Sequence, residues 1–172
     1  MEIKGTTLYT LELFRKFNRF HVMKSKTEAV LLFIIEAFLL FVFVVMCLYG
    51  NVSENSTGML FLAVLILLLP LMLFVVPWIA ARNQKNLTGI ENNFIFTEEG
   101  LTVFSKGSNI DSKAEMKYEL FYRVYETSDS FYIYQTKMNA YPLLKKDVEE
   151  NRIDDLRNLL VSKLAKGKYK RR

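Results

Sequence analysis

The stretch that decides the fold is AVLLFIIEAFLLFVFVVMCLY, residues 29–49, in which Glu36 is the only charged side chain. A second stretch, MLFLAVLILLLPLMLFVVPWIAA, residues 59–81, carries no charge at all. Each run supplies the roughly 20 apolar residues that a helix needs to cross the hydrocarbon core of a bilayer. The sequence therefore predicts a membrane-spanning helical hairpin with spans at 29–49 and 59–81.

The distribution of basic residues predicts the topology of this hairpin. The connector GNVSENSTG, residues 50–58, has no Lys or Arg, whereas the outer flanks carry Lys24, Lys26, Arg82 and Lys85. Basic residues in short flanks stay on the cytoplasmic side of a membrane. We therefore expect a multi-pass protein of the cell membrane with both termini in the cytoplasm.

The N-terminal segment, residues 1–28, should lie on that cytoplasmic side. Residues 2–9, EIKGTTLY, contain enough Ile, Thr and Tyr to form a short strand. Leu11, Phe14 and His21 then recur at helical spacing among basic residues, which predicts an amphipathic helix. This helix could lie on the anionic leaflet or pack on the C-terminal domain, and the strand could complete the sheet of that domain.

The C-terminal segment, residues 82–172, changes from helical to alternating periodicity. The pattern predicts an α+β domain, with a small antiparallel sheet or partial barrel capped by a C-terminal helix. The helix is expected over residues 148–164, because its apolar positions share one face and its acidic residues come first. The expected strands start at Phe94 and Leu101 and then cover residues 113–118, 120–127, 130–136 and 138–144.

This order of elements resembles the YcxB-like family of bacterial membrane proteins. The matching residues are FIFTEEGLTV at 94–103, MKYELFYRVYETSDSFYIY at 116–134 and YPLLKKD at 141–147, preceded by two apolar spans. The resemblance implies that the C-terminal domain is similar to a bacterial pleckstrin-homology (PH) fold. It implies an architecture more than an activity.

Glu36 is the residue in the spans that most needs an explanation. A carboxylate at the centre of a span costs roughly 2.5 to 3.5 kcal/mol on insertion scales. Glu36 is shallow, about 10 Å inside the cytoplasmic end at helical rise. It could be protonated, face Arg82 or Lys26 across water, or hydrogen-bond in a helix interface. A structural or oligomer-specifying role is favoured over proton or ion transport, because two spans cannot enclose a pathway.

Candidate catalytic groups are scarce in this sequence. Cys47 is the only cysteine and His21 the only histidine, so neither a Cys-based or His-based metal site nor a Ser-His-Asp triad is expected within one chain. The pair Glu98 and Glu99 falls in a predicted hairpin turn, where solvated charge is the better explanation. We therefore expect no enzymatic activity, no metal and no cofactor.

Two further groups of residues suggest contact with lipid. Tyr49 and Trp78 stand at opposite ends of the hairpin and are read as interface anchors. The C-terminal basic tail contains no acid, and near an anionic leaflet each of its cations could contribute about 1 kcal/mol of attraction. The alternative is a disordered, solubilising tail. The cations of this tail are Lys163, Lys166, Lys168, Lys170, Arg171 and Arg172.

These observations favour a non-enzymatic, membrane-anchored PH-like module at the cytoplasmic face. It would bind anionic lipid headgroups or a protein partner from the membrane or cytoplasm, and it could form a homo-oligomer. The alternative is an auxiliary or immunity-type membrane protein that acts through its hairpin on another membrane protein. Tyrosines interleaved with basic residues could stack bases, but a domain held beneath a membrane makes nucleic-acid binding a poor hypothesis.

Overall fold

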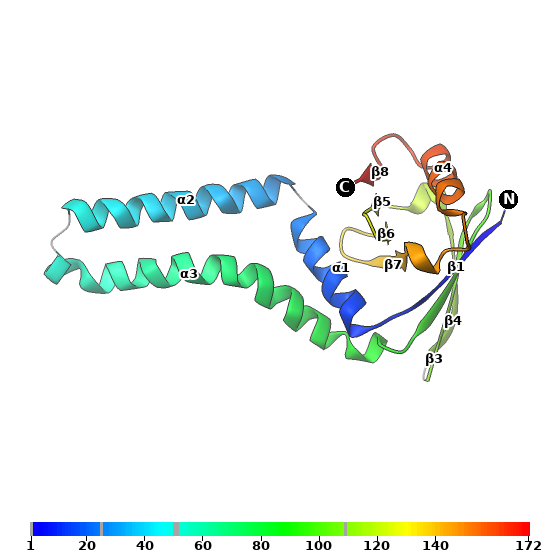
Figure 1. Ribbon diagram of the computed structural model, residues 1–172, viewed down its shortest axis with the longest axis horizontal. Coiled ribbons are helices and arrows are strands. Elements are labelled where there is room, and N and C mark those ends of the chain that lie inside the picture. Colours follow the sequence, from blue (N-terminus) through cyan, green and yellow to red (C-terminus); the bar gives the residue numbers. More distant parts are fainter. Residues whose placement is uncertain (1, 25, 50–51, 109) are drawn as a thin grey trace. The chain divides into compact units, whose positions relative to one another are not determined.

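The computed structural model describes residues 2–24, 26–49, 52–108 and 110–172. The chain forms two compact units. One unit, mostly β, combines the N-terminal residues up to 13 with residues 86–172, and the other, helical, holds residues 14–85. The protein is thus α+β, as the sequence predicts, with its helical unit inserted into the β unit (Figure 1).

The first sheet of the β unit has four antiparallel strands in the order β1-β2-β3-β4. Strand β1 pairs with β2 along its whole length, from Ile3 opposite Phe96 to Leu8 opposite Glu91. The N-terminal strand therefore completes the C-terminal sheet, which the sequence left open. The strands are β1 (Ile3–Leu8), β2 (Glu91–Phe96), β3 (Gly100–Gly107) and β4 (Ile110–Lys117).

The β1–β2 pairing also fixes where the helical insertion leaves and re-enters the β unit. The Tyr9 amide donates to the Ile90 carbonyl and the Gly89 amide donates to the Tyr9 carbonyl, each at 2.9 Å. Gly89 adopts a φ of 83°, a left-handed conformation that glycine accepts without strain. The two ends of the insertion are consequently held side by side.

The second sheet has the order β7-β6-β5-β8 and is mixed. Its first three strands are antiparallel neighbours, whereas β8 pairs with β5 in parallel. The sequence predicted no strand in the basic tail, so its alternative of a disordered tail is wrong for the residues of β8. The strands are β5 (Arg123–Glu126), β6 (Ser130–Tyr134), β7 (Ala140–Leu144) and β8 (Tyr169–Arg171).

Two of these strands begin later than the alternation suggests. A 3-10 turn, η2 (Tyr118–Leu120), precedes β5. The expected strand at 138–144 begins at Ala140, because the Thr136 hydroxyl accepts hydrogen bonds from the amides of residues 138 and 139 and forms a turn.

The C-terminal helix α4 (Ile153–Lys163) closes the core of the β unit. It starts later than predicted, because η3 (Lys145–Asp147) and Asn151, at a φ of 61°, take up the residues before it. Leu156 and Leu160, on the apolar face that the sequence predicts for this helix, are fully buried in the domain core. The shared core comprises residues from both sheets and α4, among them Ile3, Phe94, Phe96, Leu101, Val103, Val124, Phe131, Ile133 and Leu143.

The helical unit is built from α1 (Leu11–Met23), α2 (Lys26–Tyr49) and α3 (Val52–Asn83), followed by the short turn η1 (Lys85–Leu87). Helices α2 and α3 contact each other and run side by side in opposite directions (Figure 1). Helix α3 starts at Val52, so most of the predicted connector at 50–58 is helical.

Helix α3 is bent by 48° between its parts Ser56–Met72 and Val75–Asn83. Pro77 follows the break and has no amide hydrogen to donate to the carbonyl four residues earlier, which explains a bend at this place. By length and composition, Val30–Tyr49 could cross a membrane alone, while the two parts of α3 pass the same test only together.

Candidate functional site

The buried carboxylate of Glu126 is the centre of a polar cluster in the β unit. Side chains alternate between the two faces of a strand, and Glu126 lies on the same face of β5 as Val124, which belongs to the core. The Glu126 side chain is fully buried. A buried charge is costly unless it is paired and hydrogen-bonded.

Three side chains donate hydrogen bonds to this carboxylate. Lys145 Nζ lies 2.7 Å from Oε1. Arg157 approaches with two nitrogens, Nη2 at 2.6 Å from Oε1 and Nε at 2.9 Å from Oε2. The Tyr169 hydroxyl donates to Oε2. Since these residues come from η3, α4 and β8, the cluster ties the C-terminal elements to β5.

The electrostatics of the cluster keep Glu126 ionised. Burial alone would raise its pKa, but the hydrogen bonds from Arg157, Lys145 and Tyr169 outweigh burial and lower the pKa to about 2. Burial and the hydrogen bond to Glu126 raise the pKa of Tyr169. The hydrogen bond to Glu126 also raises the pKa of Arg157. With its oxygens occupied by three donors, this carboxylate is suited to holding elements together.

Glu126 is not among the site residues predicted from the sequence, although a signal for it exists. Val124 is an inward position of the strand, and a charged residue two positions later must also point inward. Such a residue needs cationic partners, and basic residues at 145 and 157 were available.

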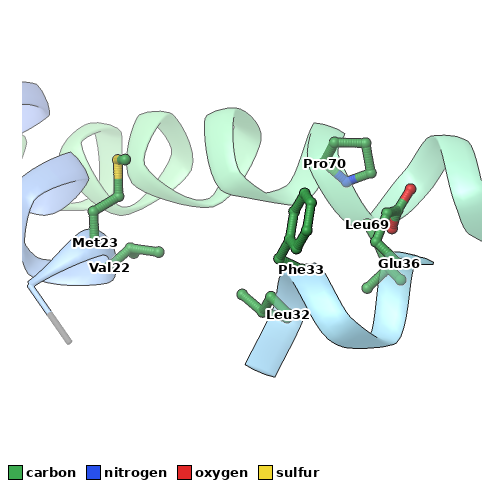
Figure 2. Close-up of a pocket in the computed structure, with 7 residues that line it drawn as sticks. All are labelled: Val22, Met23, Leu32, Phe33, Glu36, Leu69 and Pro70. Atoms are coloured by element: carbon green, nitrogen blue, oxygen red, sulfur yellow. The ribbon is translucent and has the colours of Figure 1, made fainter. Parts of the chain in front are cut away.

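Glu36, singled out from the sequence, lies in the helical unit and lines a cavity of about 230 Å³. It is the one acidic group among the lining residues, and Figure 2 shows its carboxylate close to Leu69 and Pro70 of α3. Among the described residues no ion pair reaches it. The cavity is lined by Val22, Met23, Leu32, Phe33, Glu36, Leu69 and Pro70.

The other residues of the helical unit that the sequence singled out, Tyr49, Trp78 and His21, do not line this cavity. Tyr49 and Trp78 are exposed, and the Arg82 guanidinium carbon lies 5.7 Å from the centre of the Trp78 ring. His21 contacts the Phe17 ring edge to face, with ring centroids 5.8 Å apart. The role of Tyr49 and Trp78 as membrane anchors stays a prediction.

The predicted basic tail is divided by the fold into parts with different surroundings. Lys163 pairs with Glu98 at 2.8 Å, and this contact lowers the pKa of the Glu98 carboxyl through a hydrogen bond and its charge. Lys163 therefore has a compensating acid, contrary to the prediction. Lys168 Nζ donates to the Glu119 carbonyl at 2.7 Å. The last three cations of the predicted tail, residues 170–172, lie in or directly after β8.

No group of three or more metal-ligating side chains is found among the residues that the structure describes. Cys47, the single cysteine, is exposed on α2. The Glu126 cluster in the β unit and the Glu36 cavity in the helical unit are therefore the polar features considered as candidate sites.

The fold is that of an α+β protein in which the chain between the paired strands β1 and β2 contains a pair of apolar helices. The sequence profile of a family described as YcxB-like protein matches residues 96–160, from the end of β2 into α4. This match supports the resemblance to that family, and the matched region contains Glu126, Lys145 and Arg157. No curated protein and no solved structure matches the chain.

Proposed function

We propose that this chain is a non-enzymatic membrane module in which α2 and α3 cross the membrane and hold a PH-like β unit at its cytoplasmic face. The β unit would bind anionic lipid headgroups or a protein partner. The observation that carries the proposal is the large number of apolar side chains that the two helices leave exposed.

The exposed apolar surface belongs in a lipid environment. None of the most apolar window of Val30–Tyr49 is buried, and Phe33, Phe38 and Phe41 are each more than 60% exposed. Helix α3 exposes Phe61, Leu67 and other large apolar residues as well. Soluble monomers rarely expose apolar patches of more than a few hundred Å², and a helix that is hydrophobic all round is a buried or membrane-spanning one.

The strand pairing around the insertion favours two crossings. Because Tyr9 and Ile90 are hydrogen-bonded to each other, the chain leaves and re-enters the β unit at the same place. An insertion with both ends on one side of a membrane must cross it an even number of times. The basic flanks, with Lys24 and Arg82, favour the cytoplasm as that side.

The arrangement of the β unit supports a PH-like fold. A four-stranded antiparallel sheet is followed by β5, β6 and β7, and a C-terminal helix then closes the core. The non-enzymatic part of the proposal is supported by the Glu126 carboxylate, whose oxygens are all engaged by Lys145, Arg157 and Tyr169.

A second candidate function is favoured by the cavity in the helical unit. Glu36 and Pro70 line an otherwise mostly apolar cavity between α2 and α3, which a helix of another membrane protein could use as a docking groove. In that case the hairpin would be the active part of an auxiliary or immunity-type protein, or the contact of a homo-oligomer.

Cysteine labelling in intact cells tests the proposed topology. Cys47 is first replaced by Ala, and single cysteines are then placed at Ser56 or Ser162, both exposed. An impermeant reagent should label Ser56→Cys, which would lie outside, and should spare Ser162→Cys until the cells are opened. Labelling of Ser162→Cys in intact cells would disprove the proposed orientation. If Ser162→Cys stayed unlabelled even in opened cells, the exposed position assigned to it would be wrong.

A further inference from the structure

Strand β8 presents its side chains on two faces, and this divides the basic residues at the end of the chain. Tyr169 points inward, because its hydroxyl reaches the buried Glu126. Lys170 and Arg172 therefore lie on the opposite, outer face. Lys170 is the register partner of Tyr125. Arg123, two residues before Tyr125 on β5, lies on that outer face as well.

The side chains of this outer face gather around one aromatic ring. The guanidinium carbons of Arg123 and Arg172 lie 5.8 Å and 5.7 Å from the centre of the Tyr125 ring. Arg123 also lies 5.5 Å from the centre of the Tyr122 ring, and its Nη1 donates to the Tyr125 hydroxyl at 3.0 Å. Three cations, Arg123, Arg172 and the exposed Lys170, are thus brought together at one edge of the sheet, around the buried Tyr125 ring.

Acidic groups do not balance this edge at Arg123 or Lys170. Among the described residues, neither of these two side chains takes part in an ion pair, and the hydrogen bond that raises the pKa of Arg123 is donated by its guanidinium to a phenol, not to a carboxylate. Glu126, the acid on β5, points inward to Lys145 and Arg157. Within the described ranges, Arg123 Nε is buried and has no hydrogen-bond partner. A ligand outside the sheet would therefore be met by the Nη atoms of Arg123.

We propose that Arg123 and Lys170, beside Tyr122 and Tyr125 on the outer face of β5 and β8, bind the phosphate of an anionic membrane lipid. Guanidinium groups bind phosphate oxygens through two parallel hydrogen bonds, and a lysine adds a point charge. The choice of a lipid rests on the proposed function, which places the β unit beside a cytoplasmic leaflet whose anionic headgroups attract basic residues.

The test uses the full chain in neutral detergent micelles, to which a short-chain phosphatidylglycerol is added. Amide hydrogen exchange over residues 122–126 and 168–172 should slow as the anionic lipid is added and should recover at high salt. Short-chain phosphatidylcholine should have no such effect. Slowing by phosphatidylcholine to the same extent would overturn the proposal, because a neutral headgroup would then suffice.

Paired variants connect this protection to the proposed residues. In the variant Arg123→Gln with Lys170→Gln, the apparent affinity for phosphatidylglycerol should fall about fivefold for each charge removed. The control Lys106→Gln with Lys117→Gln removes the same charge from exposed positions of the first sheet and should leave the affinity unchanged. Arg123→Lys keeps the charge but not the two parallel hydrogen bonds, so it should bind with intermediate affinity. Equal losses in the site and control variants would overturn the proposal.

A further arm separates the lipid from a soluble phosphate ester. Glycerol phosphate, added in place of the lipid, should give at most weak protection of residues 122–126. Protection at lower concentrations than phosphatidylglycerol requires would overturn the lipid assignment in favour of a soluble ligand. This outcome is distinguishable from a failure of the proposed topology, which the labelling of Ser56→Cys measures independently.

Discussion

The two units of the molecule treat a carboxylate in different ways. Glu126 in the β unit is fully buried and receives hydrogen bonds from Lys145, Arg157 and Tyr169. Glu36 in the helical unit lines a mostly apolar cavity beside Pro70, and no described cation pairs with it. The β unit therefore supplies the cations that pair with its own buried carboxylate. The described part of the helical unit supplies no cation to the carboxylate of Glu36.

The same contrast holds for apolar side chains. The β unit places Ile3, Phe94 and Leu160 in one core with no exposed surface, while Phe33 on α2 is 75% exposed. The hydrophobic effect therefore stabilises the β unit in water, but it would favour burial of the helical pair in lipid or against a partner. We therefore expect the β unit to be stable in water and the helical unit to need lipid, detergent or a partner. Substitutions of corresponding side chains in the two units should change stability by different amounts.

The largest expected effect comes from separating the units. A fragment of residues 82–172 lacks β1, and thereby loses the buried Ile3 and the whole β1–β2 ladder. We expect this fragment to show no cooperative melting transition. A chain in which residues 11–87 are replaced by a short glycine-serine linker keeps β1 and should melt cooperatively in water without detergent. Near-ultraviolet circular dichroism of the tyrosines would follow both.

The linked chain should also be monomeric and soluble, because its exposed apolar helices have been removed. Its matched control carries Ile3→Asp, which places a charge in the core and should abolish the transition. Cooperative melting of the fragment 82–172 itself would show that β1 is dispensable, and the β unit would then be a sequential domain that begins near residue 82.

The next largest effect concerns Glu126. Replacing it with Gln leaves Lys145 and Arg157 without their common anion in a mostly buried place, and breaking a buried pair in this way costs about 3 to 5 kcal/mol. Asp154→Asn is the matched control, since Asp154 also contacts Arg157 but its side chain is 81% exposed. That control should cost less than about 1 kcal/mol. Urea unfolding of the full chain in micelles measures both, and similar costs would show that the Glu126 cluster is not a structural tie.

The sequence was sufficient where the relevant pattern is local. Each of these patterns is formed by residues that are close together in the sequence. The apolar run at 29–49 therefore predicted α2, and the alternation around Phe94 and Leu101 predicted the β2–β3 hairpin. The packing of Leu156 and Leu160 also follows from helical spacing within one segment. In each case the pattern of apolar residues reflects their preference for positions away from water.

The sequence was insufficient where the structure depends on distant partners. Strand β1 pairs with a strand more than 80 residues later, and no local pattern specifies that choice. Strand β8 is a short basic segment that pairs with β5 more than 40 residues earlier and is joined to it by the Tyr169 contact to Glu126. The alternation of β5 indicates that Glu126 points inward, but its cationic partners Lys145 and Arg157 lie far along the chain and no local pattern specifies them.

The third prediction tests the packing of α4. Leu160 is fully buried in the core, so Leu160→Ala should cost about 2 to 5 kcal/mol of unfolding free energy. Val161, the next residue, is 53% exposed, and Val161→Ala should change stability by less than about 1 kcal/mol. Thermal melting of the two variants in the same detergent gives the comparison. If Val161→Ala cost as much as Leu160→Ala, the face of α4 that packs on the core would be wrongly assigned.

The fourth prediction uses the lowered pKa of Glu126. Its pKa is about 2 in the folded chain against an ordinary value of 4.5, so the folded state favours the ionised form. The stabilisation is complete above the ordinary pKa and is lost as the pH falls from there through the folded pKa. By pH 3 about 2 kcal/mol should be gone. Glu126→Gln should lack this component, and an unchanged acid slope in that variant would assign the loss to other carboxyls.

The smallest expected effect concerns Glu36 and tests the contrast between the units directly. Glu36→Gln keeps the size of the side chain and one carbonyl oxygen but removes the ability to carry charge. If Glu36 acts as a hydrogen-bonding group beside Pro70, the variant should change the melting of the hairpin by about 1 kcal/mol or less, in line with hydrogen bonds between membrane helices. Far-ultraviolet circular dichroism in micelles follows the helices, and Cys47→Ser, at an exposed position of the same helix, is the control. A loss of several kcal/mol, comparable to that of Glu126→Gln, would show that Glu36 is ionised and paired with a cation. The helical unit would then compensate its charge as the β unit does, and a partner chain would become the first place to look for that cation.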